Sequence, residues 1–165
     1  MISPEILRRY PFFAGLDYDQ IVGIAQVATE ENVENGAYFF HDGEQVDKFY
    51  LLVDGAVSIV IEVPDRETGS SVAGQLTGNL KMKDIVVSTV GKGSVFGWPG
   101  LIPPHEAHMG AKAVTDARVF VFDCNALLEK FEADPRFAYM LTLKAAQVMR
   151  ERLRDMAIES LAFSA

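Results

Sequence analysis

Cysteine, long apolar runs and signal-like termini are all missing or scarce in this sequence. Its 165 residues contain a single cysteine, Cys124, which excludes an internal disulfide framework and fits a reducing compartment. No apolar run approaches the ~20 residues of a membrane-spanning helix, and the first residues lack the basic-then-apolar order of a signal peptide. These absences predict a cytoplasmic protein with no membrane partner.

Positive charge is also in short supply. Fifteen lysines and arginines face 23 aspartates and glutamates, which gives a formal net charge of −8. Phosphate polymers are therefore repelled on average, because non-specific nucleic-acid affinity comes from basic side chains that displace condensed counterions. The densest basic stretch, residues 150–154, is interrupted by Glu151 and is interpreted as a solvated helix face. We expect no nucleic-acid partner and no DNA-binding domain.

The composition is otherwise that of a globular chain, with 49% hydrophobic and 23% charged residues, and the length suits one domain over residues 1–165. Apolar residues recur at helical intervals in residues 1–30, where Asp17 and Gln20 have the spacing of a capping box. We therefore predict two short N-terminal helices that are separated by a turn at Ala14-Gly15.

Residues 31–124 are short β-rich runs separated by glycine. Asn35-Gly36 and Asp54-Gly55 are dipeptides that favour tight hairpins, and residues 49–63 form the clearest predicted hairpin. Residues 64–83 are rich in glycine, serine and threonine and predict a long strand-to-strand loop. Several short strands at this spacing indicate a sandwich, roll or barrel.

The helical pattern returns over residues 125–163. One helix starts at Asn125, and Asp134-Pro135 begins a second one that continues to about Phe163. An apolar stripe along this second helix is longer than one side of a small roll can cover. We expect its far part to pack on a second copy of the chain and form a homodimer, with these residues at the contact: Val148, Met149, Leu153 and Met156.

The order of these elements, together with a set of glycines at strand ends, resembles a known family. The glycines are Gly43, Gly55, Gly93 and Gly97. The chain is similar to the cyclic nucleotide-binding domain, the sensor half of the catabolite-activator and fumarate–nitrate-regulator class. The resemblance implies an α+β, mainly β fold: a double-stranded β-helix or jelly roll, with N-terminal helices and a long C-terminal helix. It also implies a stand-alone sensor or regulatory module and not an enzyme.

The resemblance places the family's phosphate-binding cassette after Gly97. Members that bind a cyclic nucleotide have a glutamate next, which accepts the ribose 2′-hydroxyl, and an arginine with a serine or threonine about ten residues on. Here Trp98 stands at the glutamate, His108 at the arginine and Met109 at the serine or threonine. Tryptophan accepts no hydrogen bond, and a largely neutral histidine binds phosphate poorly. The cassette implied by the resemblance comprises Gly97, Trp98, Pro99, Gly100, Leu101, His108 and Met109.

We therefore predict a degenerate cassette that does not bind cyclic AMP or cyclic GMP in the ordinary mode, and no cofactor. Alternatives to this prediction stay open. One is that Lys112, Arg66 or Arg118 substitutes for the missing phosphate-binding arginine. Another is that the chain is a true receptor for a cyclic nucleotide, for another small ligand, or for haem with His105, His108 or Met109 as axial ligands. A third alternative is a ligand-free interaction module in which Trp98 and the prolines plug the pocket.

A metal site is the weakest candidate. His105 and His108 are spaced three residues apart and could combine with His41, but structural zinc sites usually show four clear ligands. We interpret these histidines as solvated loop residues and expect no metal. Catalytic motifs are not evident either, because Cys124 lies in an apolar run with no histidine nearby in sequence.

Overall fold

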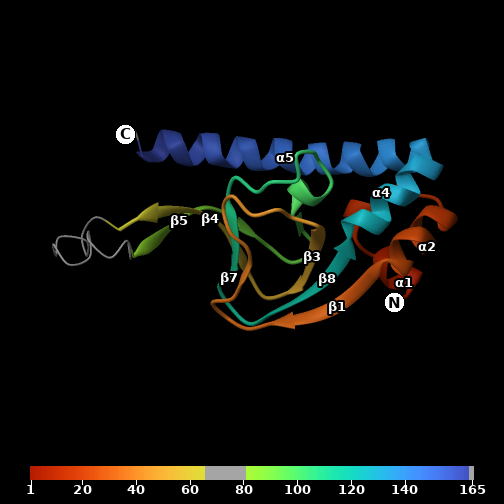
Figure 1. Ribbon diagram of the computed structural model, residues 1–165, viewed down its shortest axis with the longest axis horizontal. Coiled ribbons are helices and arrows are strands. Elements are labelled where there is room, and N and C mark those ends of the chain that lie inside the picture. Colours follow the sequence, from red (N-terminus) through yellow and green to blue (C-terminus); the bar gives the residue numbers. More distant parts are fainter. Residues whose placement is uncertain (66–80, 164–165) are drawn as a thin grey trace.

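The computed structural model describes residues 1–65 and 81–163 and contains two antiparallel sheets of four strands each. The loop predicted over residues 64–83 lies mostly outside the described residues, and so does Arg66. The first sheet has the order β1-β8-β3-β6, with bounds Ala28–Val33, Ala117–Asp123, Lys48–Asp54 and Val95–Phe96. The second has the order β2-β7-β4-β5, with bounds Tyr38–Phe40, Gly110–Ala113, Val57–Pro64 and Met82–Val90. The two sheets form the predicted roll (Figure 1).

Helices precede and follow the roll as the periodicity predicted. The N-terminal part holds α1 (Pro4–Leu7), the 3₁₀ turn η1 (Pro11–Phe13) and α2 (Tyr18–Gln26). The capping box is confirmed, because the Asp17 side chain accepts the Gln20 N–H at 2.9 Å and the Gln20 side chain accepts the Asp17 N–H at 3.1 Å. Between β6 and β7 lies a second 3₁₀ turn, η2 (Trp98–Gly100), and the chain closes with α4 (Cys124–Ala133) and α5 (Pro135–Phe163).

Both hairpins predicted at the glycine dipeptides are wrong. Asn35-Gly36 carries the chain from β1 to β2, and Asp54-Gly55 carries it from β3 to β4, so each turn crosses from one sheet to the other. The local turn chemistry was correct, since Gly55 has φ +92°, but the pairing was not. Strand β3 pairs with β8 and β6, which lie far away in sequence. A neighbouring pair that does form a hairpin ladder is β4 with β5.

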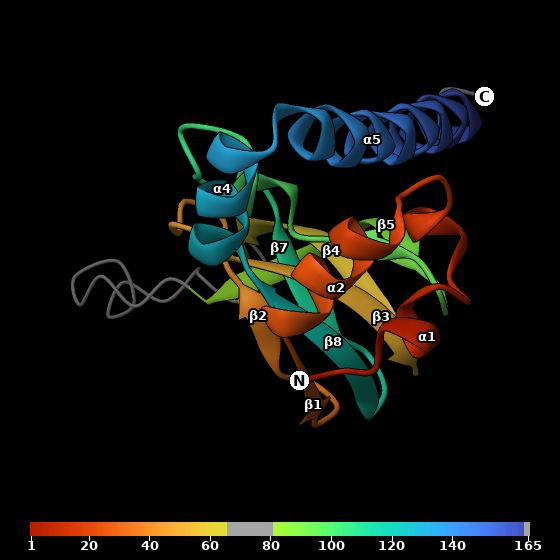
Figure 2. The same ribbon diagram turned by 90° about the vertical axis from the view of Figure 1, so that its right-hand side faces the viewer.

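Except for its edge strand β1, which is mostly exposed, the first sheet is buried on both faces. Its inner face contributes Leu52, Phe96 and Val121 to the core between the two sheets. Its outer face contributes Phe49, Phe120 and Phe122 to a second core, which the N-terminal helices, α4 and the first turns of α5 cover (Figure 2). A strand buried on both sides must be apolar at nearly every position, which explains the continuous apolar runs of β3 and β8.

Helix α5 begins where the sequence predicted. The Asp134 carboxylate accepts the Phe137 N–H at 3.0 Å, and Pro135 occupies the first helical position. The first turns pack into the outer core through Phe137 and Leu141, and Ala145 one turn further on is also buried. The helix then continues across the roll and past it, above the β4-β5 ladder (Figure 1). None of the described helices is long and apolar enough to cross a membrane.

The crossing turn at Gly55 offers a direct test of this topology. A Cβ atom added there would lie 2.4 Å from the Asp116 carbonyl oxygen, in a backbone with φ +92°. We expect Gly55→Ala to lower the free energy of unfolding by about 3 kcal/mol, since left-handed strain and steric overlap add together. Urea denaturation measures this loss.

The matched control is Gly36→Ala. Gly36 has a similar φ of +89°, but a Cβ atom there meets nothing within 4 Å. Only the strain remains, so we expect a loss of about 1 kcal/mol. Equal losses in the two variants would contradict the close approach between the Gly55 turn and Asp116.

Candidate functional site

The loop between β6 and β7 is held tightly against the first sheet at its start. Gly97 has φ +92°, and a Cβ atom there would lie 2.8 Å from the Lys48 carbonyl oxygen. At Gly100 an added Cβ would lie 2.6 Å from the Cys124 sulfur atom. The indole ring of Trp98 packs 5.6 Å from the Phe49 ring, centroid to centroid. The backbone path of the loop is therefore fixed by contacts that admit no larger residue at these glycines.

A cavity of about 380 Å³ separates this loop from α5. This volume is near the lower end of the ~300–1,000 Å³ that small-molecule sites occupy. The cavity is lined by the loop, by β2, β4 and β5, and by the middle of α5, and α5 passes directly over the loop (Figure 1). We call it the loop–helix cavity; its lining is mostly apolar, with these residues: Phe40, Ile59, Ser88, Gly97, Trp98, Pro99, Ile102, Pro103, Pro104, Glu106, His108, Met109, Met149, Arg152, Leu153 and Met156.

The structure brings most of the candidate cassette to this cavity. Of the seven residues, five line it: Gly97, Trp98, Pro99, His108 and Met109. The other two have structural contacts instead, because Gly100 lies against Cys124 and Leu101 packs on the outer core. His108 is exposed, and Trp98 and Met109 are half-buried.

The predicted dimer residues have contacts within their own chain. Met149, Leu153 and Met156 line the loop–helix cavity, and Val148 packs against the outer core. Leu153 is nevertheless 70% exposed, and further along the helix Leu161 is 72% exposed. The distal half of α5 thus lines the cavity with one side, and it also carries apolar side chains that are exposed to solvent.

Sequence reasoning missed Arg152, the cation of this cavity. Its guanidinium carbon lies 5.5 Å from the centroid of the Trp98 ring, and its Nη2 donates a hydrogen bond to the Val95 carbonyl oxygen at 2.5 Å. Burial lowers the pKa of Arg152 to about 10, so the side chain is still charged at neutral pH. The interpretation of residues 150–154 as a solvated face is therefore wrong for Arg152. Its spacing of three and four residues from Met149 and Met156 was the signal that places it on the inner face.

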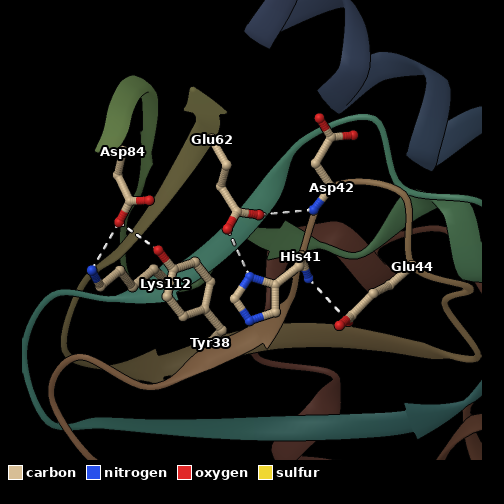
Figure 3. Close-up of polar contacts among 7 residues, drawn as sticks. All are labelled: Tyr38, His41, Asp42, Glu44, Glu62, Asp84 and Lys112. Atoms are coloured by element: carbon tan, nitrogen blue, oxygen red, sulfur yellow. Dashed lines mark hydrogen bonds and ion pairs between the residues drawn. The ribbon is translucent and has the colours of Figure 1, made fainter. Parts of the chain in front are cut away.

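Of the three cations considered as substitutes, two are committed elsewhere. Ala111 and Ala113 are buried and Lys112 faces outward, as strand alternation requires. The Lys112 ammonium lies 2.8 Å from the Asp84 carboxylate and 5.0 Å from the Tyr38 ring centroid (Figure 3). Arg118 pairs with Glu30 at 3.3 Å on the surface. Neither contacts the loop–helix cavity.

Histidines at the candidate metal and haem positions are held by separate partners. The Nδ1 atom of His41 lies 2.9 Å from a Glu62 oxygen on the outer face of the second sheet, and its ring stacks on Tyr38 (Figure 3). The Nδ1 atom of His105 lies 2.8 Å from the Pro99 carbonyl oxygen, which ties the loop to itself. Among the residues described, no three His, Cys, Asp or Glu side chains gather as a metal site would require.

The single thiol is unsuited to nucleophilic chemistry. Cys124 is buried at the start of α4, and desolvation, followed by the nearby Asp123 and Asp47 carboxylates, raises its pKa to about 12. A thiol with such a pKa is protonated at neutral pH, and the thiol form is not the nucleophile. Its contact with Gly100 indicates a packing role beneath the loop.

The two sheets and the flanking helices place the chain in the class of roll-shaped domains with a long C-terminal helix. Residues 30–134 match the family model of the cyclic nucleotide-binding domain, and the chain belongs to that family. The family is regulatory. A solved structure of a putative cyclic nucleotide-binding protein from Geobacter metallireducens is similar with a TM-score of 0.75 and 28% identity, over 93% of this chain and 99% of that one.

Two transcription regulators are also similar to this chain. A CRP-like cAMP-activated global transcriptional regulator from Mycobacterium tuberculosis is 22% identical over 93% of this chain, which spans only 61% of that relative's length. The sensor domain of the regulator DNR from Pseudomonas aeruginosa shares the fold with a TM-score of 0.61 and 20% identity, over 91% of this chain and 95% of that one.

The Lys112–Asp84 pair gives a prediction with a definite pH dependence. The hydrogen bond from Lys112, and after it the one from Tyr38, lowers the pKa of Asp84 in the folded chain. A lowered folded pKa contributes stability above the unfolded value near ~3.9, and this contribution is lost as pH falls through the folded pKa. Lys112→Met should therefore cost about 1 kcal/mol of unfolding free energy at pH 7, and the difference from the unaltered chain should shrink below pH ~3.9.

The control is Lys92→Met. Lys92 pairs with Asp54, and both side chains are more than half exposed, so its removal should change stability little at any pH. Urea denaturation of both variants between pH 7 and pH 3 measures the effect. A constant deficit for Lys112→Met across this range would show that the ion pair is not its cause.

Proposed function

We propose that this chain is a ligand-sensing regulatory domain that binds a small molecule in the loop–helix cavity and transmits its occupancy through α5. The observation that carries the proposal is the shared lining of the cavity, because Trp98 and Met109 come from the cassette loop and Met149 and Met156 come from α5. A molecule that fills this space contacts both elements at once.

The chemistry of the cassette supports a mode of binding other than the ordinary cyclic-nucleotide mode. The Trp98 indole is only a donor, and the thioether of Met109 is only a weak acceptor. The His108 ring lacks the paired N–H donors with which a guanidinium binds phosphate. A cyclic phosphate brought here would lose its hydration without the paired donors that compensate for it in a working cassette. The name of the M. tuberculosis relative keeps cyclic AMP among the ligands to be tested.

The coupling needs two states that the ligand distinguishes. Helix α5 is fixed at its start by Phe137 and Leu141, whereas its distal half touches the roll through the cavity lining and β5. A ligand that binds more tightly to one position of the distal helix shifts the population toward that position. The output of such a domain is then the orientation or pairing of the distal helix.

The opposing hypothesis is a ligand-free interaction module whose pocket is plugged by Trp98 and the prolines. The 380 Å³ of open space beside Trp98 favours the sensor, since a plugged pocket would leave no such volume. Stability measurements separate the two hypotheses. A ligand that binds the folded state raises the free energy of unfolding, whereas a plugged pocket binds no ligand and the free energy of unfolding stays constant.

A thermal-shift screen with fluorescence detection tests the proposal. Trp98 is the only tryptophan and lines the cavity, so its emission reports occupancy. The screen would include cyclic mono- and dinucleotides, nucleoside monophosphates and small organic acids with their neutral analogues. We expect at least one compound to raise Tm by a few degrees at ~100 times its Kd and to shift the Trp98 emission.

The control variant is Trp98→Phe, which keeps an aromatic ring on Phe49 and removes the fluorophore. It should retain the Tm shift and lose the emission change. A flat Tm and constant emission across the whole panel would refute a sensor role for this cavity.

We also propose that the distal half of α5 pairs with its copy in a homodimer. Leu153, Ile158 and Leu161 are 70%, 54% and 72% exposed, and apolar side chains on one helix are most readily covered by another helix. Because Leu153 also lines the cavity, the test uses two variants, Leu153→Glu and Leu161→Glu. Both should elute later from a sizing column than the unaltered chain.

The matched control is Gln147→Glu, an exposed position on α5 that adds the same charge without removing apolar surface. Its elution volume should equal that of the unaltered chain. If all three variants elute together, the helix does not mediate association.

A further inference from the structure

We propose that the loop–helix cavity takes an apolar monocarboxylate, with its carboxylate on the Arg152 guanidinium and its hydrophobic body among the methionine and aromatic side chains. The inference rests on the proposed function and names the ligand class for the same site. Its basis is a desolvated cation in an otherwise apolar cavity, which lies on α5 and not in the cassette loop.

Among the described residues, Arg152 has no charged partner. Among residues 1–65 and 81–163, no carboxylate oxygen lies within 4 Å of its guanidinium, and its hydrogen bond goes to the neutral Val95 carbonyl. A guanidinium carries five N–H donors, and one accepting carbonyl satisfies only one of them. A half-buried cation in this state gains most from an anion that meets two donors at once, and a carboxylate has that geometry.

The rest of the cavity selects an apolar body. Its walls include Phe40, Ile59 and the three methionines Met109, Met149 and Met156. Methionine side chains are flexible and polarizable, so they adapt to irregular apolar shapes. Ser88 is the polar side chain of the strand wall, which offers little to the hydroxyls of a ribose ring.

The charges around the cavity favour a single negative charge. Among the described residues that line the cavity, Arg152 is the one Lys or Arg side chain, and Glu106 and His108 in the same lining are exposed. A second negative charge on the ligand would find no second cation and would face Glu106, in a chain whose formal net charge is already −8. Phosphate monoesters and dicarboxylates are therefore disfavoured.

The experiment compares acids with their neutral isosteres on the full chain. The probes are octanoate, 4-phenylbutyrate and 2-naphthoate, each with its primary amide, and cyclic AMP as a polar monoanion. Trp98 emission and thermal shift give Kd for each probe. We expect at least one of the three carboxylates to bind, and its amide to bind about tenfold or more weakly, as a charge-assisted pair requires.

The variants assign this preference to Arg152. Arg152→Met keeps the length and apolar character of the side chain and should abolish the preference for acid over amide. Arg152→Lys keeps the positive charge but lacks the paired N–H donors of a guanidinium, so it should retain part of the preference for acid over amide. Arg154→Met, two residues further on an exposed position of α5, should leave the preference intact.

Stability without ligand separates a binding role from a structural one. Arg152→Met removes one hydrogen bond and the contact with Trp98, but it also removes the cost of holding a charge without an anionic partner out of water, so its Tm should be close to that of the unaltered chain. A clearly lowered Tm would assign Arg152 to stability and overturn the proposal. So would amides that bind as well as acids, or an acid preference that persists in Arg152→Met.

The outcomes also separate this inference from the proposed function. If a neutral amide or cyclic AMP binds with a Trp98 response while the carboxylates do not, the sensor role stands and the carboxylate assignment fails. If these probes and the wider panel all leave Tm and Trp98 emission unchanged, both fail.

Discussion

Strands β8, β3 and β6 are buried on both faces, the inner face against the second sheet and the outer face against the helices. This double burial fixes the two elements that enclose the candidate site, the loop after β6 and helix α5. On the outer side it anchors the first turns of α5 through Phe137 and Leu141. At its edge it receives the loop that follows β6, where Gly97 and Gly100 approach the backbone of Lys48. Loop and helix therefore meet over the roll because each is fastened to the same sheet.

The same anchoring makes the two halves of α5 energetically unequal. The proximal half buries large apolar side chains and is part of the core, whereas Leu153 and Leu161 in the distal half are mostly exposed. Elements with few buried apolar contacts open or move at lower free energy than core elements. The part of the helix that lines the cavity is thus the part whose position a ligand or a second copy can change with a modest interaction free energy.

Short sequence motifs predicted helix starts and turns well, but they predicted the pairing of strands poorly. The capping box at Asp17 and the N-cap at Asp134 were visible because each interaction spans three residues. The hairpin expected at Gly55 failed because the turn residue reports only its own dihedral angles, and the partners of β3 and β4 are set by the roll. Arg152 was missed for a related reason: a charged residue next to other charges was assigned to water, although its helical spacing from Met149 and Met156 pointed inward.

Arg152 contacts both β6 and the loop from its place on α5. It is carried by α5, it donates to the Val95 carbonyl of β6, and its guanidinium lies over the Trp98 ring of the loop. An anion that binds the remaining N–H donors of the guanidinium neutralises the charge over the Trp98 ring, so it would alter the contact between the helix and the loop. A tenfold difference in ligand affinity between two helix positions corresponds to ~1.4 kcal/mol. One charge-assisted hydrogen bond is worth about that much, so in the proposed sensor a single contact at Arg152 would be enough to couple the cavity to the distal helix.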